Sequence, residues 1–139
     1  MTKLKNDFVT NSSSVSFLLW GVSLYGKEVT ENVKLMKSLY DLLKSNEYYQ
    51  KKYVDLSFED FSGWNFDKVQ NISYDLLDGY SDLVFTWGQN QDDFIIGKSM
   101  KNIKDNETFA QFKKDAEEAL KNLGINKTAS MIERSWYDG

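Results

Sequence analysis

The first apolar run of the chain extends from Val15 to Tyr25. Apolar side chains occupy both alternating sets of positions in this run, which is typical of a strand that is covered on both faces. The residues before it, from Lys3 to Ser14, are mostly polar. We therefore predict that residues 15–25 form the central strand of a sheet.

A helical period follows the first strand. Thr30 is placed to cap a helix that ends near Asn46 and carries lysines and Asp41 on its exposed side. The apolar positions recur at helical spacing and comprise Val33, Met36, Tyr40 and Leu43, widened to a broad face by Leu35, Leu39 and Leu42.

The period is lost between Glu47 and Phe66, where large rings alternate with charged residues. The rings of this aromatic block are Tyr48, Tyr49, Tyr53, Phe58, Phe61, Trp64 and Phe66. Neither the period of a strand nor that of a helix fits the whole block. We predict a short helical turn, a brief strand near Val54 and then a loop.

The pair Asp78-Gly79 favours a hairpin in the middle of the chain. The pair suits a type I′ turn, whose two central residues both have positive φ, and it separates residues 72–77 from residues 80–87. A helix over 67–77, with Val69, Ile72 and Leu76 on one face, is the alternative.

The next helix has the clearest signals in the sequence. Asp105 or Asn106 is placed to cap it, and its apolar face comprises Phe109, Phe112, Ala116, Leu120 and Leu123. Gly124 stands where a left-handed residue ends many helices. Ile125 is then placed to pack back on Leu120 in a Schellman motif.

The order of the predicted elements indicates an α+β fold. A strand over 94–96, closed by Gly97, follows the turn residues 88–92, and residues 130–137 alternate as a last strand. The chain thus consists of strand, helix, meander, helix and strand, and 139 residues suit one domain. We predict a single domain, 1–139, with a mixed or mostly antiparallel sheet packed with two main helices.

The missing residue types exclude most catalytic chemistry. The chain has no histidine and no cysteine, which removes the usual general base, thiolate nucleophiles and the common zinc ligands. The acid pairs Glu59/Asp60 and Asp92/Asp93 lack the spacing of a Mg²⁺ or Ca²⁺ site, so we interpret them as solvated turn carboxylates. No serine-lysine motif of a hydrolase occurs. We expect no enzymatic activity, no metal and no cofactor.

Charge and hydropathy narrow the possible partners further. The net charge is −4, and only Arg134 among the 17 basic residues is an arginine, so we expect no direct binding to nucleic acid. No apolar segment is suited to export or to spanning a membrane. These features predict a cytoplasmic protein that has no membrane association.

Two groups of residues are candidates for binding. The run Asn11, Ser12, Ser13 and Ser14 could hold an anion through its hydroxyls and backbone amides, although a polar segment that bonds its own backbone is the simpler explanation. Aromatic residues make up 15% of the chain, and clustered rings are typical of protein interfaces or of a core. The candidate partner-binding residues are Tyr48, Tyr49, Tyr53, Asp55, Phe58, Glu59, Asp60, Phe61 and Trp64, whose acids favour a partner with a basic surface.

The segment Asp7-Phe8-Val9-Thr10-Asn11-Ser12-Ser13-Ser14-Val15-Ser16-Phe17 resembles the start of a group of small uncharacterised proteins from bacteria and their phages. Those proteins share roughly Asp-Phe-Val-Thr-Asn-Ser-Ser-Ser-x-Ser-Phe, and the resemblance brings no catalytic residues with it. It implies a phage or mobile-element accessory protein that acts by stoichiometric protein binding, for example as an inhibitor of a host defence system such as CRISPR. A small-ligand or nucleotide-binding module and a structural phage protein are the alternatives.

Overall fold

A computed structural model describes the backbone of residues 14–87 and 93–137 and the side chains of residues 18–87 and 93–133. Four antiparallel strands form one sheet in the order β2-β3-β1-β4. The strands are β1 (Ser14–Tyr25), β2 (Leu83–Trp87), β3 (Asp93–Ser99) and β4 (Ser130–Tyr137). The predicted α+β class, the central position of the first strand and the last strand are confirmed.

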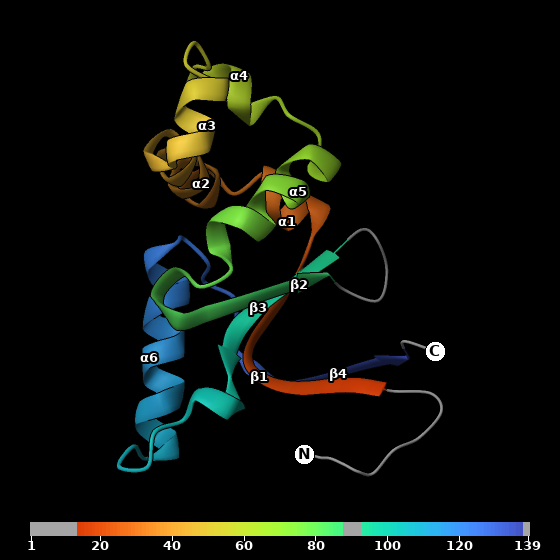
Figure 1. Ribbon diagram of the computed structural model, residues 1–139, viewed down its shortest axis with the longest axis vertical. Helices are drawn as coiled ribbons and strands as arrows, with labels where there is room; N and C mark the ends of the chain where they lie inside the picture. Colours follow the sequence, from red (N-terminus) through yellow and green to blue (C-terminus); the bar gives the residue numbers. More distant parts are fainter. Residues whose placement is uncertain (1–13, 88–92, 138–139) are drawn as a thin grey trace.

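The helices lie in two groups (Figure 1). Helix α6 runs beside the sheet, whereas α3 and α4 lie at the end of the molecule farthest from β4. The helices are α1 (Gly26–Thr30), α2 (Val33–Ser45), α3 (Glu47–Lys52), α4 (Phe58–Ser62), α5 (Phe66–Leu77) and α6 (Phe109–Asn122), with short 3₁₀ turns η1 (Tyr80–Asp82) and η2 (Met100–Asn102).

Strand β1 pairs first with β4 and then with β3. Its residues 14–21 pair with β4, and its residues 19–25 pair with β3, so the change of partner occurs around Gly21. Figure 1 shows that β1 bends sharply between its two ends. One long strand therefore joins the β4 side of the sheet to the β3 side and changes direction on the way.

Two paired glycines allow this bend. Gly21 lies opposite Gly97 of β3, and a β-carbon added at Gly97 would lie 2.6 Å from the Trp20 carbonyl oxygen and 2.7 Å from the Gly21 α-carbon. Both distances are far below van der Waals contact, so only glycine fits at this crossing. The prediction that Gly97 closes its strand is wrong, because β3 continues through Gly97 to Ser99.

The main core lies between one face of the sheet and the helices. Val22 and Leu24 of β1 pair with Ile96 and Phe94 of β3, which places these four side chains on the same face. They pack in one buried cluster with helix residues that include Leu35, Leu39, Leu43, Val69, Ile72, Leu76, Leu120 and Leu123.

The hairpin predicted around Asp78-Gly79 is wrong, and its alternative, a helix, is correct. Helix α5 occupies residues 66–77 because its apolar residues bury one side and Asn65 caps it by accepting the Lys68 N–H. Gly79 has a φ of 91°, but it follows the end of a helix instead of forming a two-residue hairpin turn. Only β2, which begins at Leu83, and β3 remain of the predicted meander.

The cap of helix α2 differs from the prediction. Thr30 ends α1, and Asn32 caps α2 by accepting the Leu35 N–H at 3.0 Å. The Asn32 side chain also donates to the Gly124 carbonyl at 2.9 Å, so it joins the start of α2 to the end of α6. Val33 was predicted to face the core but is 71% exposed, because a residue in the first turn lies outside the packed stripe.

Helix α6 has the predicted apolar face with one exception. Phe112, Ala116, Leu120 and Leu123 are buried, whereas Phe109 in the first turn is 41% exposed. The cap is Thr108, whose hydroxyl accepts the Gln111 N–H, and neither Asp105 nor Asn106 has this role.

The predicted end of α6 is confirmed. Gly124 has a φ of 98°, and the Ile125 N–H donates to the Leu120 carbonyl, as a Schellman motif requires. The strand predicted near Val54 is wrong, because residues 53–55 form a turn in which Val54 is 67% exposed.

Replacing Gly21 by alanine tests the glycine crossing. The added β-carbon would lie 2.5 Å from the Gly97 α-carbon, so Gly21→Ala should lower the free energy of unfolding by about 3 kcal/mol. Gly63→Ala is the matched control, since its β-carbon would meet nothing closer than 3.5 Å at an ordinary helical φ of −88°. Denaturant unfolding should find the control unchanged or more stable by about 0.5 kcal/mol. Equal stability of Gly21→Ala and the wild type would contradict the crossing.

Candidate protein-binding surfaces

The predicted aromatic block forms α3, α4 and the turns beside them. Six of its rings and Tyr40 of α2 make a continuous chain of contacts with centroids 5.0–6.1 Å apart, in the order Tyr48, Tyr49, Tyr53, Trp64, Phe61, Tyr40 and Phe58. Tyr49 and Phe61 are buried, so they belong to the core and are not available as anchors for a partner. Tyr53, Phe58 and Trp64 are half-buried. The exposed members are Tyr48, Asp55, Glu59 and Asp60.

Tyr49 ties this block to α5. Its hydroxyl donates a hydrogen bond to the Asp75 carboxylate. Burial of the phenol, helped by the hydrogen bond and the negative charge of Asp75, raises the pKa of Tyr49 to about 12. The neutral phenol is therefore favoured in the folded chain, and Tyr49 acts as a structural link.

Lysines of this chain cover the rings of the block. The Lys68 ammonium lies 4.0 Å from the centre of the Trp64 ring, and the Lys52 ammonium lies 5.6 Å from both Tyr48 and Tyr53. Lys37 lies in the same way over Tyr40 and Phe58, at 5.0 and 5.3 Å. These cation–π contacts use the ring faces that a partner's cation would otherwise approach.

The described residues of the other candidate groups, the Asn-Ser run and the acid pairs, do not form an anion-binding or metal-binding cluster. Asn11, Ser12, Ser13 and Asp92 lie outside the described residues, as does the side chain of Ser14. The prediction of a solvated turn carboxylate is wrong for Asp93, which is buried in β3. One of its oxygens accepts the Ser23 hydroxyl at 3.1 Å, and the other has no hydrogen-bond partner within the described residues. Within residues 14–87 and 93–137, no three acidic, histidine or cysteine residues gather as metal ligands do.

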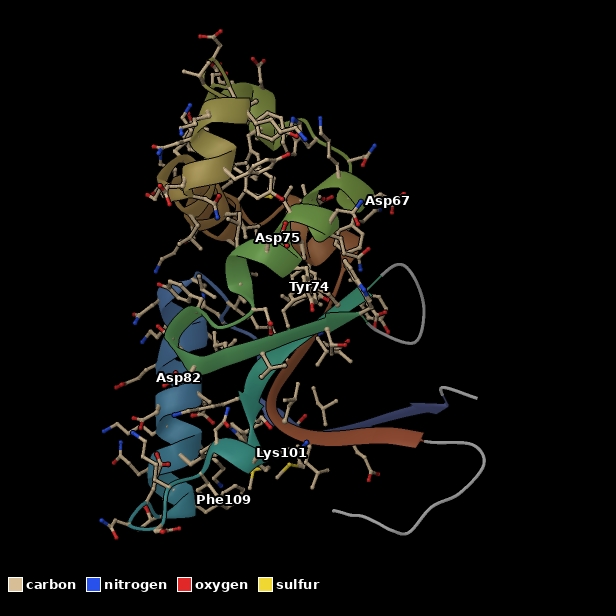
Figure 2. The ribbon with its side chains drawn as sticks, viewed as in Figure 1. Asp67, Tyr74, Asp75, Asp82, Lys101 and Phe109 are labelled. Carbon is tan, nitrogen blue, oxygen red and sulfur yellow. The ribbon has the colours of Figure 1, made fainter. Side chains whose placement is uncertain are left out.

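A second surface, which was not predicted, runs along the exposed side of α5. Asp67, Asn71, Tyr74 and Asp78 follow one another at intervals of three or four residues, so they form one stripe of the helix. All four are exposed. Figure 2 shows Asp67, Tyr74 and Asp75 along α5, with Asp82 near the start of β2.

Tyr74 extends this surface onto the edge of the sheet. Its ring stacks on Trp87 of β2 with centroids 6.0 Å apart and planes at 21°. Tyr74 is 46% exposed and Trp87 is 44% exposed, while Phe85 packs edge-on beneath both rings. We name Asp67, Tyr74, Asp75, Asp78, Asp82 and Trp87 the acidic edge.

The backbone of β2 is partly closed to a further strand. The Phe85 N–H donates to the Asp78 carboxylate at 3.1 Å, and the Leu83 carbonyl accepts the Gly79 N–H at 2.7 Å. These bonds occupy the backbone N–H and C=O groups that the first half of the strand would otherwise present at the open edge of the sheet. A partner on this edge would therefore use side-chain contacts more than strand addition.

The turn before β2 holds two residues in an uncommon conformation. Ser81 and Asp82 have φ values of 49° and 63°, although neither is glycine. Each costs about 1 kcal/mol or more, and such strain is concentrated at functional positions. The turn places the exposed Asp82 carboxylate at the end of the acidic edge opposite Trp87.

A signal in the sequence could have located this surface. From Val69 to Gly97 there is no lysine or arginine, whereas aspartate occurs at positions 75, 78, 82, 92 and 93. These are five of the chain's 21 acidic residues, so outside this segment 16 acidic residues are balanced by all 17 basic residues. The net negative charge of the protein thus originates in this one segment. In the part of the chain that the structure describes, none of the aspartates of the acidic edge forms an ion pair.

The described surface also contains shallow hollows. One of about 780 Å³ beside α3 is lined by Glu47, Tyr48, Lys51 and Lys52, all on one short helix. It is a concave patch, not an enclosed site of the kind that buries a small ligand. None of the described helices combines the length and the apolar character needed to cross a bilayer.

Comparisons with known proteins do not place the chain in a family. No family model matches the chain, and neither the curated proteins nor the solved structures give a match. The surfaces must therefore be interpreted from their own geometry and charge.

Tyr49→Phe tests the link between the aromatic block and α5. The variant keeps the ring and loses the bond to Asp75, so the free energy of unfolding at neutral pH should fall by about 1–2 kcal/mol. The raised pKa of Tyr49 means that the unfolded chain releases the phenol proton at lower pH than the folded chain. This stabilisation should be complete below pH 10 and lost as the pH rises through about 12.

The matched control for this experiment is Tyr48→Phe, which removes a hydroxyl from the exposed neighbouring tyrosine. Unfolding of the three proteins should be followed from pH 8 upwards. The stability difference between wild type and Tyr49→Phe should shrink above pH 10, whereas Tyr48→Phe should follow the wild type. A difference that does not change with pH would show that the hydroxyl is not held as described.

Proposed function

We propose that this protein acts without catalysis, by stoichiometric binding of a protein partner that presents a basic surface. The contact would be made by the acidic edge. The observation that supports this proposal most is the segment from Val69 to Gly97, which carries the protein's net negative charge and places exposed aspartates beside two exposed stacked rings. Aromatic anchors ringed by polar residues are characteristic of protein interfaces, and the exposed carboxylates add complementarity to a basic partner.

Charge determines which kind of partner is favoured. Aspartates without ion pairs attract basic side chains and repel the phosphates of nucleic acid. Proteins that bind nucleic acid present surfaces rich in lysine and arginine. The acidic edge would therefore suit such a surface and would compete there with the nucleic acid.

The resemblance of residues 7–17 to small phage and bacterial proteins supplies a setting for this proposal. In that setting the chain would be a phage or mobile-element accessory protein in the cytoplasm of a bacterial host cell. A basic, nucleic-acid-binding component of a host defence system, such as a CRISPR effector, would be its partner, and binding would inhibit that component.

A binding experiment with charge-neutralising variants tests the proposal. The immobilised protein is incubated with host lysate, captured proteins are identified by mass spectrometry, and their association rates are then measured with purified material. The double variant Asp67→Asn, Asp82→Asn should lower the association rate about tenfold at low salt and reduce its salt dependence. Asparagine suits position 82 because it tolerates the left-handed φ of 63° there.

The control is the double variant Glu59→Gln, Asp60→Asn in the aromatic block. It removes the same charge, and Glu59 and Asp60 lie in the first turn of α4 as Asp67 lies in the first turn of α5. This control should bind at the wild-type rate. If it loses binding while the first double variant retains it, the aromatic block is the interface and the acidic edge is not.

A further inference from the structure

Lysines lie over most of the exposed aromatic rings in the part of the chain whose side chains the structure describes. Across residues 18–87 and 93–133, five aromatic side chains are exposed, namely Tyr25, Tyr48, Tyr74, Trp87 and Phe109. Lys127 lies 5.8 Å from the Tyr25 ring, Lys52 lies 5.6 Å from the Tyr48 ring, and Lys113 lies 4.9 Å from the Phe109 ring. All three distances are within the range of a cation–π contact.

Tyr74 and Trp87 are the exception. No lysine or arginine of the described chain lies over either ring, although the two rings stack on each other and are nearly half exposed. The sequence explains this gap, because the segment that contains both rings has no basic residue between Val69 and Gly97. The ring faces, which carry the negative end of the aromatic quadrupole, remain without a cation in a surround of aspartates.

We infer that the Tyr74–Trp87 pair is the binding site for an arginine side chain of the partner. The inference rests on the proposed function and specifies its central contact. A planar guanidinium can stack on the outer ring face while its N–H groups donate to nearby carboxylates, which a compact ammonium cannot do equally well. The stripe of α5 places Asp78 one turn after Tyr74, with one carboxylate oxygen accepting the Phe85 N–H.

This chain does not provide that arginine from its own sequence. Its single arginine, Arg134, lies in β4, and β4 is at the opposite edge of the sheet from β2. The other exposed rings have cations from their own chain, so the uncovered pair is where an external cation gains most. The occupant is therefore a guanidinium that another protein supplies.

The test uses the whole protein and a capped peptide of alternating glycine and arginine. Two matched peptides replace arginine by citrulline, which has a similar shape without the charge, or by lysine. Binding is followed by nuclear magnetic resonance at the tryptophan indole N–H groups, with the Trp87 signal identified from its loss in Trp87→Leu. The arginine peptide should shift the Trp87 signal saturably, and the citrulline peptide should not.

Two variants locate the contact. Trp87→Leu keeps an apolar side chain over Phe85 and should weaken the arginine peptide about fivefold, measured from the backbone amide signals of β2 because this variant has no Trp87 indole. Tyr48→Leu removes a ring that Lys52 already covers and should leave the affinity unchanged. Thermal unfolding of both variants confirms that each is folded. A Trp87→Leu variant with wild-type affinity, a citrulline peptide that binds as well as arginine, or no saturable shift at Trp87 overturns the inference.

The remaining outcomes separate this inference from the proposed function. A lysine peptide that binds as tightly as the arginine peptide overturns the assignment to arginine. If a basic partner depends on Asp67 and Asp82 while the peptide fails, the proposed function stands and the arginine site does not. If the peptide binds at Trp87 but no partner depends on those aspartates, the arginine site stands and the proposed function fails.

Discussion

The contact between the backbones of Gly21 and Gly97 is the constraint on which the rest of the structure depends. It lets β1 leave β4 and join β3 within one continuous strand, with a change of direction that a side chain would block. Strand β2 then pairs with β3, whereas β4 pairs with the first half of β1. The acidic edge is formed on β2 and α5, at the opposite edge of the sheet from β4.

One kind of contact, a lysine over a ring, distinguishes the two candidate surfaces. In the aromatic block the contacts are internal: Lys52, Lys68 and Lys37 lie over rings that also touch one another. That arrangement stabilises a small group of helices and uses up its ring faces. On the acidic edge, no lysine or arginine of the described chain lies over Tyr74 or Trp87. The carboxylates beside these rings also have no ion pairs in the described chain. Asp75 and Asp78 accept hydrogen bonds from Tyr49 and Phe85, but a surface whose rings and carboxylates have no cation within the described chain is the better candidate for contact with a basic partner.

The sequence predicts those elements whose period is long and uninterrupted. Strand β1, helix α2 and helix α6 follow directly from their apolar spacing, and the end of α6 follows from Gly124. The residues of α5 were predicted to form a hairpin because Asp78-Gly79 is a strong turn signal. The same dipeptide also occurs where a glycine with positive φ ends a helix. Burial of Val69, Ile72 and Leu76 against the sheet decided between the two, and that contact is not local in the sequence.

Helix α4 of the aromatic block and the acidic edge were not predicted, for different reasons. Helices α3 and α4 have six and five residues, too few for a period to emerge, and their rings pack on one another instead of forming a stripe. The acidic edge combines residues of α5 and β2 whose proximity depends on the fold. Its sequence signal was an absence of lysine and arginine, which a search for charged clusters does not detect.

Asn32 joins two helix ends whose electrical characters are opposite. The first turn of α2 presents unpaired N–H groups and a partial positive charge, whereas the last turn of α6 presents carbonyl oxygens and a partial negative charge. The Asn32 amide accepts from the Leu35 N–H in the first turn of α2 and donates to the carbonyl of Gly124, which directly follows the end of α6, so the two helix ends are held close together. An aspartate would retain the cap but would place a second oxygen against the Gly124 carbonyl. Asparagine fits this position because it is a donor and an acceptor at once, and it thereby connects parts of the chain that are 92 residues apart.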